Sequence, residues 1–278
     1  MNNLSSLQSS LDNCLWAMSP QDFLSFKERI GGMKADIYTN QNSNNSDDDD
    51  DDDTVWSESG TAFINVNGPL VRGTGMNDTL CNLCGVCELD NLDQLLMAAR
   101  DNPDVSRIIL IFNSPGGVSH SLSTALLIQQ IAMEKDVIGY VPSTCCSAAY
   151  ELASACSELY CGPTAWLGFV GVIYARADVT EMNGQLGIGY TFITSSPKKL
   201  YLNPNAKITP EEKEWIEQSV EYSYNQFKDL VLSNRDIDPK YLDSSIFIGE
   251  QAVKLNFADG IKNNLEELSM QNSQTISQ

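Results

Sequence analysis

Two short segments place small residues directly after apolar, strand-like runs, and both contain the residue types that acyl transfer requires. Residues 113–117 read NSPGG, and the two glycines let backbone amides point outward, where they can hold an oxyanion. Residues 145–150 read CCSAAY and offer Ser147 as a nucleophile among small neighbours. A serine that opens a helix has backbone amides beside it that stabilise negative charge. Taken singly, the two segments are equally compatible with a tight turn and an ordinary helix cap.

A serine nucleophile needs a general base, and few residues of the chain offer one. A Ser-His-Asp triad requires a histidine, and the sequence contains one, His120, just past the glycine turn. We expect His120 to cap or flank the helix that follows. Lys198 and Lys199 are the other candidates, although lysines are ordinarily solvated on the surface. Because an ordinary lysine amine is protonated at neutral pH, a lysine base requires a site that excludes water.

The ordered set of these motifs resembles a known family. NSPGG is followed by the SAAY-type serine, then by GFVGV at residues 168–172, then by a lysine and Asn203-Pro204. This set is similar to the signal peptide peptidase A family of serine peptidases, especially its phage branch, the lambda protein C type of prohead protease. The likeness extends over residues 56–262. It implies the fold shared by Clp protease and the crotonases, an α/β fold with stacked parallel β-sheets flanked by helices.

The resemblance also implies roles for individual residues. The family's nucleophile falls on Ser147 and its general base on Lys199, with Lys198 as the rival in register. The oxyanion donors fall on the backbone amides of Gly117 and Ala148, and Gly116 shapes the turn between strand and donor. The implied enzyme is a serine endopeptidase with a Ser-Lys dyad, acting on peptides and proteins without a cofactor or a metal.

The sequence departs from the family pattern at two places. Ala148 and Ala149 stand where many members have two glycines, which would narrow the site. Phe169 stands where many members have a serine, which bears on the substrate groove.

Several functions stay open on the sequence alone. A crotonase-like enzyme for acyl-CoA thioesters also uses paired amides, but it needs no serine beside the second amide. A non-catalytic capsid-assembly or scaffolding protein would keep the fold, although the presence of both Ser147 and Lys199 argues against lost catalysis. Within the peptidases, we favour a phage prohead protease that cleaves scaffold and capsid proteins over a bacterial peptidase that degrades signal peptides. Family members form rings or bowls, so a homo-oligomer is implied.

The remaining sequence divides into segments of different composition. Alternating strands and helices predict an α/β domain over residues 56–262. An apolar pattern predicts a helical segment over residues 1–34, and residues 35–55, rich in Asn, Ser and Asp, predict a disordered acidic linker. We expect residues 263–278 to form a flexible tail. Strands are expected at 62–66, 108–112, 137–141 and 159–161, and helices at 89–100, 120–134, 147–154 and 209–234.

Charge and cysteine content exclude some partners. The net charge of −20 disfavours binding to nucleic acid. The sequence has no apolar run of about 18 residues and no signal-peptide pattern, so we expect a cytoplasmic protein, in the host or in a prohead, without a membrane anchor. Its eight cysteines are then thiols. The spacing of Cys81, Cys84 and Cys87 invites a metal site but lacks a fourth ligand, so we expect loop or packing residues.

Overall fold

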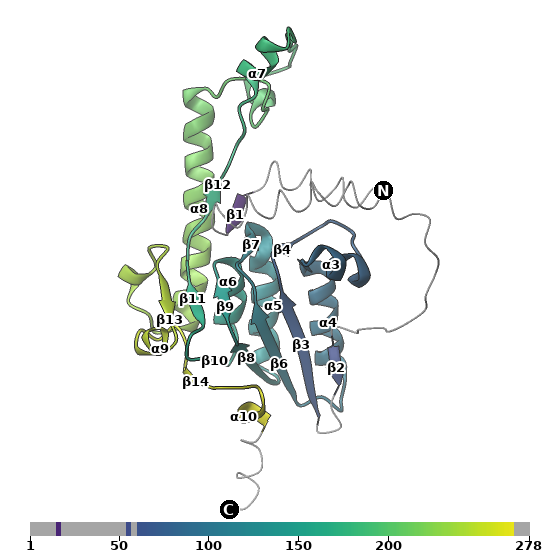
Figure 1. Ribbon diagram of the computed structural model, residues 1–278, viewed down its shortest axis with the longest axis vertical. Helices are drawn as coiled ribbons and strands as arrows, with labels where there is room; N and C mark the ends of the chain where they lie inside the picture. The colour runs from purple at the N-terminus through teal and green to yellow at the C-terminus, as the bar shows by residue number, and fades with distance from the viewer. Residues whose placement is uncertain (1–14, 18–53, 57–59, 270–278) are drawn as a thin grey trace, which may run out of the picture.

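A six-stranded sheet forms the base of the molecule in the computed structural model, which describes residues 15–17, 54–56 and 60–269 (Figure 1). The strand order is β14-β10-β8-β6-β3-β2. Neighbouring strands are parallel except at the edge, where β2 runs antiparallel to β3. The α/β prediction with parallel strands is therefore confirmed. The strands are β2 (Thr54–Trp56), β3 (Thr61–Asn67), β6 (Arg107–Asn113), β8 (Asp136–Val141), β10 (Glu158–Cys161) and β14 (Gly260–Ile261).

Helices cover one face of this sheet, and the core lies between the two layers. The helices are α4 (Leu89–Asp101), α5 (Leu122–Ala132) and α6 (Ala148–Ser154), which pack on one another and on the strands. The central strands are buried on both faces, as their unbroken apolar runs predict. On the opposite face, Ile109, Ile138 and Tyr140 pack with Leu268 of α10 (Glu266–Ser269). Ordered packing therefore continues into the predicted tail as far as residue 269.

Two smaller sheets lie beside the large one. A five-stranded sheet has the order β12-β1-β7-β4-β5, and a three-stranded sheet has the order β13-β11-β9. The strands of the five-stranded sheet are β1 (Leu15–Ala17), β4 (Leu70–Val71), β5 (Cys87–Glu88), β7 (Gly117–Val118) and β12 (Ile173–Tyr174). The strands of the three-stranded sheet are β9 (Thr144–Cys146), β11 (Trp166–Gly168) and β13 (Ile246–Ile248). Three short helices lie between larger elements in the chain: η1 (Ser119–Ser121) between β7 and α5, η3 (Pro239–Tyr241) between α8 and β13, and α9 (Glu250–Lys254) between β13 and β14.

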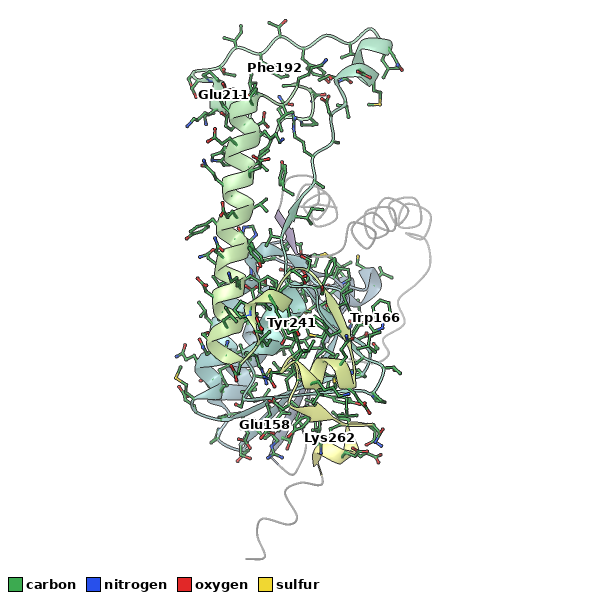
Figure 2. The ribbon with its side chains drawn as sticks, turned by 90° about the vertical axis from the view of Figure 1, so that its left-hand side faces the viewer. Glu158, Trp166, Phe192, Glu211, Tyr241 and Lys262 are labelled. Carbon is green, nitrogen blue, oxygen red and sulfur yellow. The ribbon has the colours of Figure 1, made fainter. Side chains whose placement is uncertain are left out.

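A long helix carries an arm away from the sheets. Thr209 is the N-cap of helix α8 (Pro210–Asn234), and its side chain accepts a hydrogen bond from the Glu212 N–H. Phe227, Leu230 and Val231 near its end are buried against the body. We call residues 175–216 the arm; it contains α7 (Thr180–Gln185), η2 (Pro197–Leu200) and the first turns of α8. Figure 2 shows its labelled residues at the end of the molecule opposite Glu158 and Lys262.

The structure differs from the sequence predictions in two connecting regions. Cys81 and Cys84, expected as loop or packing residues, lie in α3 (Asp78–Cys84), which is capped by Asn77 and ended by Gly85 at φ 62°. Residues 15–17 form strand β1, whereas the apolar pattern predicted helix; the rest of the predicted segment 1–34 lies outside the described residues. Residues 35–53 of the predicted linker also lie outside them, and 54–56 form β2. No helix among the described residues is long and apolar enough to cross a membrane.

Candidate active site

Ser147 occupies a strained turn between strand β9 and helix α6. Its backbone lies at φ 56° and ψ −126°, a region that residues other than glycine rarely adopt. The Ser147 N–H donates to the Gly168 carbonyl at 2.7 Å, and its own carbonyl accepts from the Glu151 N–H at 3.0 Å. The residue is 1 % exposed. Such strain costs about 1–3 kcal/mol and persists where the surroundings enforce it, most often at functional sites.

The GFVGV segment wraps around this serine. The Ser147 hydroxyl donates to the Gly171 carbonyl at 3.4 Å. Phe169 is held at φ 55° while its N–H donates to the Ser245 carbonyl at 2.8 Å. The Ser244 hydroxyl donates to the Val170 carbonyl at 3.3 Å and fixes the same segment. The motif that carried the resemblance in sequence is therefore in direct contact with Ser147.

The glycine turn reaches Ser147 through strand pairing. Ser114, just after β6, forms a parallel bridge with Cys145 of β9. The Ser114 N–H donates to the Thr144 carbonyl at 2.9 Å, and the Cys146 N–H donates to the Ser114 carbonyl at 3.2 Å. The two segments singled out by their small residues, about 30 positions apart in the sequence, therefore lie on neighbouring strands.

The direction of the Gly117 amide follows from its neighbours. Gly116 lies at φ 106°, and its carbonyl accepts from the Leu70 N–H of β4 at 2.9 Å. Backbone groups alternate in direction along a strand, so the N–H of Gly117 faces the edge away from β4. A Cβ at position 117 would lie 2.0 Å from the Leu70 carbonyl oxygen, so no other residue type fits this close approach. Position 117 therefore requires a glycine, and its N–H points away from β4.

Ala148 and Ala149 begin helix α6 and are completely buried. The first N–H groups of a helix have no partner within it, so the Ala148 amide is oriented like an oxyanion donor. The methyl groups present where many relatives have glycine are accommodated in the core rather than in the open site. Helix α6, which begins at Ala148, contacts strand β7, which contains Gly117.

The predicted lysine base lies elsewhere. Lys198 and Lys199 belong to η2 and are exposed on the arm. The adjoining chain is tied to the start of α8, because the Leu202 N–H donates to Glu212 Oε1 at 2.7 Å. Among the described residues, the hydrogen bond of the Ser147 hydroxyl is to the Gly171 carbonyl and not to either lysine.

His120 does not replace the lysine. It is exposed in η1, beside the helix that follows, which agrees with the expected flanking position. Within the described residues, no hydrogen bond joins the Ser147 hydroxyl to a histidine or a lysine.

Glu151 is a neighbour of the site that the sequence analysis missed. It follows Ser147 by one helical turn, is 4 % exposed, and accepts a hydrogen bond from the Ser121 hydroxyl. Burial raises the pKa of the Glu151 carboxyl to about 7, and the bond from Ser121 opposes the rise. Ser121 follows β7 in η1, so this pair connects the nucleophile helix to the glycine strand. The sequence signal that could have pointed to a buried carboxyl is that Glu151 stands alone among the small and apolar residues of SAAYELA, residues 147–153.

A groove of about 620 Å³ opens beside Ser147 between β12 and α8. It contains Gly171, whose carbonyl contacts the serine hydroxyl, at one wall. Its other walls combine apolar side chains with three carboxylates. The lining residues are Gly171, Val172, Ile173, Tyr174, Ile216, Glu217, Val220, Glu221, Tyr224, Leu242, Asp243 and Ser244.

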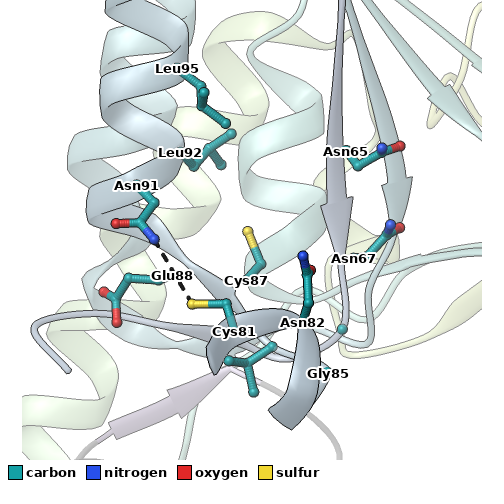
Figure 3. Close-up of a pocket in the computed structure, with 12 residues that line it drawn as sticks. Asn65, Asn67, Cys81, Asn82, Gly85, Cys87, Glu88, Asn91, Leu92 and Leu95 are labelled. Carbon is teal, nitrogen blue, oxygen red and sulfur yellow. Dashed lines mark hydrogen bonds between the residues drawn. The ribbon is translucent and has the colours of Figure 1, made fainter. Parts of the chain in front are cut away.

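A separate cavity of about 220 Å³ contains the cysteine cluster (Figure 3). Cys81 and Cys87 line it with Glu88, and the Asn91 amide donates to the Cys81 sulfur at 3.9 Å. Cys84 is buried in α3. Among the described residues, no group of three or more His, Cys, Asp or Glu is placed to hold a metal ion. Cys81 and Cys84 are part of the hydrophobic core, and Cys87 packs against it.

Comparisons with known proteins agree on one family. The model of peptidase family S49 matches residues 129–274, more than half of the chain. Capsid assembly protease C of Escherichia phage lambda is 25% identical over 216 residues, covering 76% of this chain and 48% of that protein. Putative protease MJ0651 of Methanocaldococcus jannaschii is 29% identical over 175 residues, covering 60% of this chain and 55% of that protein. The chain thus spans about half the length of these relatives.

Among solved structures, a point mutant of the 1510-N membrane-bound stomatin-specific protease is similar with a TM-score of 0.44 and 15% identity. The match covers 77% of this chain and 84% of that one.

Proposed function

Because the chain belongs to peptidase family S49, we propose that it is a serine endopeptidase whose nucleophile is Ser147. One observation carries the proposal. Ser147 is held at φ 56° in a strand-to-helix turn, and its strand pairs with the end of the strand that leads into the glycine turn. Membership of the family supplies the reaction class, and the strained serine supplies the residue.

The proposed reaction is acyl transfer to serine followed by hydrolysis. The Ser147 oxygen attacks a peptide carbonyl as its proton passes to the base, and the amides of Gly117 and Ala148 hold the oxyanion. Collapse of the intermediate breaks the C–N bond, and the base returns the proton to the leaving amine. Water, activated by the same base, then hydrolyses the acyl ester and frees Ser147. The base in this proposal is Lys199.

We infer that Lys199 acts on the serine of a neighbouring copy. Lys199 belongs to the arm, and Figure 2 shows the arm residues Phe192 and Glu211 at the end of the molecule opposite Glu158 and Lys262. The arm also exposes a series of large apolar side chains, and Ile193 among them is 94 % exposed. Exposed apolar surface of this kind is typical of a protein–protein interface. The exposed large apolar residues of the arm are Met182, Leu186, Ile188, Tyr190, Phe192, Ile193, Ile208 and Trp215.

We place this activity in the assembly of a phage head, with scaffold and capsid proteins as substrates. The support is the relative from phage lambda, which is named as a capsid assembly protease and matches 76% of this chain. Purified scaffold and capsid proteins from the same source should be cut by the wild type and left whole by Ser147→Ala. If the wild type cuts neither protein, the assignment to phage head assembly is wrong. The peptidase activity itself would then be tested on a peptide library.

The nucleophile is tested by labelling and substitution. A serine-reactive phosphonate should label the wild type at Ser147, and Ser147→Ala should lose both the label and the peptidase activity. Ser157→Ala is the matched control, because Ser157 is an exposed serine just beyond the same helix. Full activity of Ser147→Ala would refute the mechanism.

The position of the base is tested by mixing two inactive variants. Ser147→Ala and Lys199→Ala should each be inactive alone. If serine and lysine meet across an interface, random assembly of equal amounts restores both groups in roughly a quarter of the sites. The mixture should then recover roughly a quarter of wild-type activity. Two inactive variants whose mixture stays inactive would place both groups in one chain, and full activity of Lys199→Ala would eliminate Lys199.

A further inference from the structure

Strand β1 fills a gap one strand wide between β7 and β12 (Figure 1). It runs antiparallel to both neighbours. On one side, Ala17 is the register partner of Gly117 and Trp16 that of Val118. On the other side, Trp16 is the partner of Ile173, and the residue before it pairs with Tyr174. We call the space between β7 and β12 the slot.

The slot passes directly along the candidate active site. Its first edge contains Gly117, whose N–H faces away from β4 and therefore toward the position of Ala17. Its second edge, β12, begins two residues after Gly171, whose carbonyl accepts the Ser147 hydroxyl. A carbonyl at the place of residue 17 is thus next to the proposed oxyanion donor. An extended chain in the slot therefore lies beside both groups.

Without β1, the backbone groups along two strand edges would be unpaired. Such edges bind extended peptides by completing the sheet, and main-chain hydrogen bonds supply the affinity. Because β7 and β12 are both antiparallel to the occupant, a peptide has one favourable direction, that of β1. The residue opposite Gly117 in the present occupant is an alanine.

We propose that the slot is the site where peptide substrates bind as an extended strand, and that β1 is an internal competitor occupying it. The inference rests on the proposed function, since it names how the substrate of that site is held. Preferred substrates are extended peptides with a small residue opposite Gly117, as in Leu15-Trp16-Ala17. A tethered strand competes at a high effective concentration, so substrates must displace it before cleavage.

The occupancy of the slot is tested without catalysis, in full-length Ser147→Ala. Ala17→Pro removes a strand N–H and disfavours pairing, whereas Ala17→Ser keeps it and is the matched control. Hydrogen–deuterium exchange at the amides of Gly117 and Ile173, which face the slot, should rise at least about tenfold in Ala17→Pro and stay unchanged in Ala17→Ser. Unchanged exchange in Ala17→Pro would overturn the inference. Residues 108–112 report on the core; if they lose protection, Ala17→Pro is replaced by Trp16→Pro, which removes the N–H on the β12 side, and exchange should then rise at Ile173.

The use of the slot by peptides is tested by competition. A synthetic peptide with the sequence of residues 13–19 should restore slow exchange at both edges of Ser147→Ala/Ala17→Pro. A peptide of the same composition in scrambled order is the control. Protection by neither peptide, or equally by both, would overturn the inference that the slot selects a substrate strand.

Activity separates this inference from the proposed function. With Ser147 present, Ala17→Pro should raise kcat/KM for a short peptide at least about fivefold over Ala17→Ser, because the competitor is lost. If exchange and competition behave as expected but both proteins are inactive, the peptidase proposal fails and the peptide slot stands. If the wild type is active and Ala17→Pro changes neither exchange nor kcat/KM, the peptidase proposal stands and the internal competitor is refuted.

Discussion

Replacing Glu151 with glutamine should make the stability of the protein less dependent on pH. Glu151 is 4 % exposed, and burial raises the pKa of its carboxyl from 4.5 to about 7 despite the bond from Ser121. The folded protein therefore binds this proton more tightly than the unfolded chain does. The stability associated with this group is complete below pH about 4.5 and is lost as the pH rises to about 7.

The size of the effect follows from the interval between the two pKa values. At about 1.4 kcal/mol per pKa unit, ionised Glu151 lowers the free energy of unfolding by roughly 3 kcal/mol above pH 7. Glutamine does not titrate, and its carbonyl can still accept the bond from Ser121. Relative to wild type, Glu151→Gln should therefore gain about 2–3 kcal/mol between pH 5 and pH 8.

The assay is equilibrium unfolding in urea for both proteins at several pH values from 5 to 8.5. Taking the difference between the two cancels the titration of all other groups. Ser121→Ala provides a second test, because losing its bond favours the protonated carboxyl and moves the pH window upward. A difference between Glu151→Gln and wild type that stays constant within about 0.5 kcal/mol across this range would refute the buried-carboxyl argument.

Three further substitutions test the packing around the site. Gly117→Ala places a methyl 2.0 Å from the Leu70 carbonyl oxygen, so it should disrupt β7 and reduce kcat by at least about 100-fold, measured by steady-state kinetics with circular dichroism as the folding control. Arg235→Ala removes the ion pair with the half-exposed Asp259 and the hydrogen bond to the Cys156 carbonyl, and it should cost about 1–2 kcal/mol in urea unfolding; no loss would contradict the pairing. Tyr150→Phe removes the hydrogen bond that the Tyr150 hydroxyl donates to the Phe257 carbonyl at 3.0 Å, and it should lower the free energy of unfolding in urea by about 1–2 kcal/mol. Tyr222 is exposed, so Tyr222→Phe is the control that should leave stability unchanged.

The strands and helices of the body were predictable because local sequence determines them. β6 and β8 are continuous apolar runs that match burial on both faces, and α8 has its Thr209 cap and Pro210 start in the sequence. The glycine turn and Ser147 were both recognisable as motifs that follow apolar runs, whereas the bridge between Ser114 and Cys145 that joins the two sheets was seen only in the structure.

The features that escaped prediction depend on distant partners. Strand β1 pairs with residues 100 or more positions away, and three apolar residues give no signal of such pairing. Lys199 was found through the motif, but its place on an arm is set by contacts between η2, Arg176 and the start of α8. Glu151 looked like a helix-favouring acid, and only tertiary packing makes it buried.

The regular geometry of α8 constrains how this protein can vary. Each residue removed between Glu212 and Phe227 would turn the distal end by about 100° and draw it inward by about 1.5 Å. A single deletion would therefore point Lys199 in a new direction. Deletion of seven residues, which is close to two full turns, would nearly keep the direction of Lys199 and would bring it about 10 Å closer to the body. Only changes in the length of α8 by nearly whole numbers of turns would therefore keep the direction in which Lys199 points.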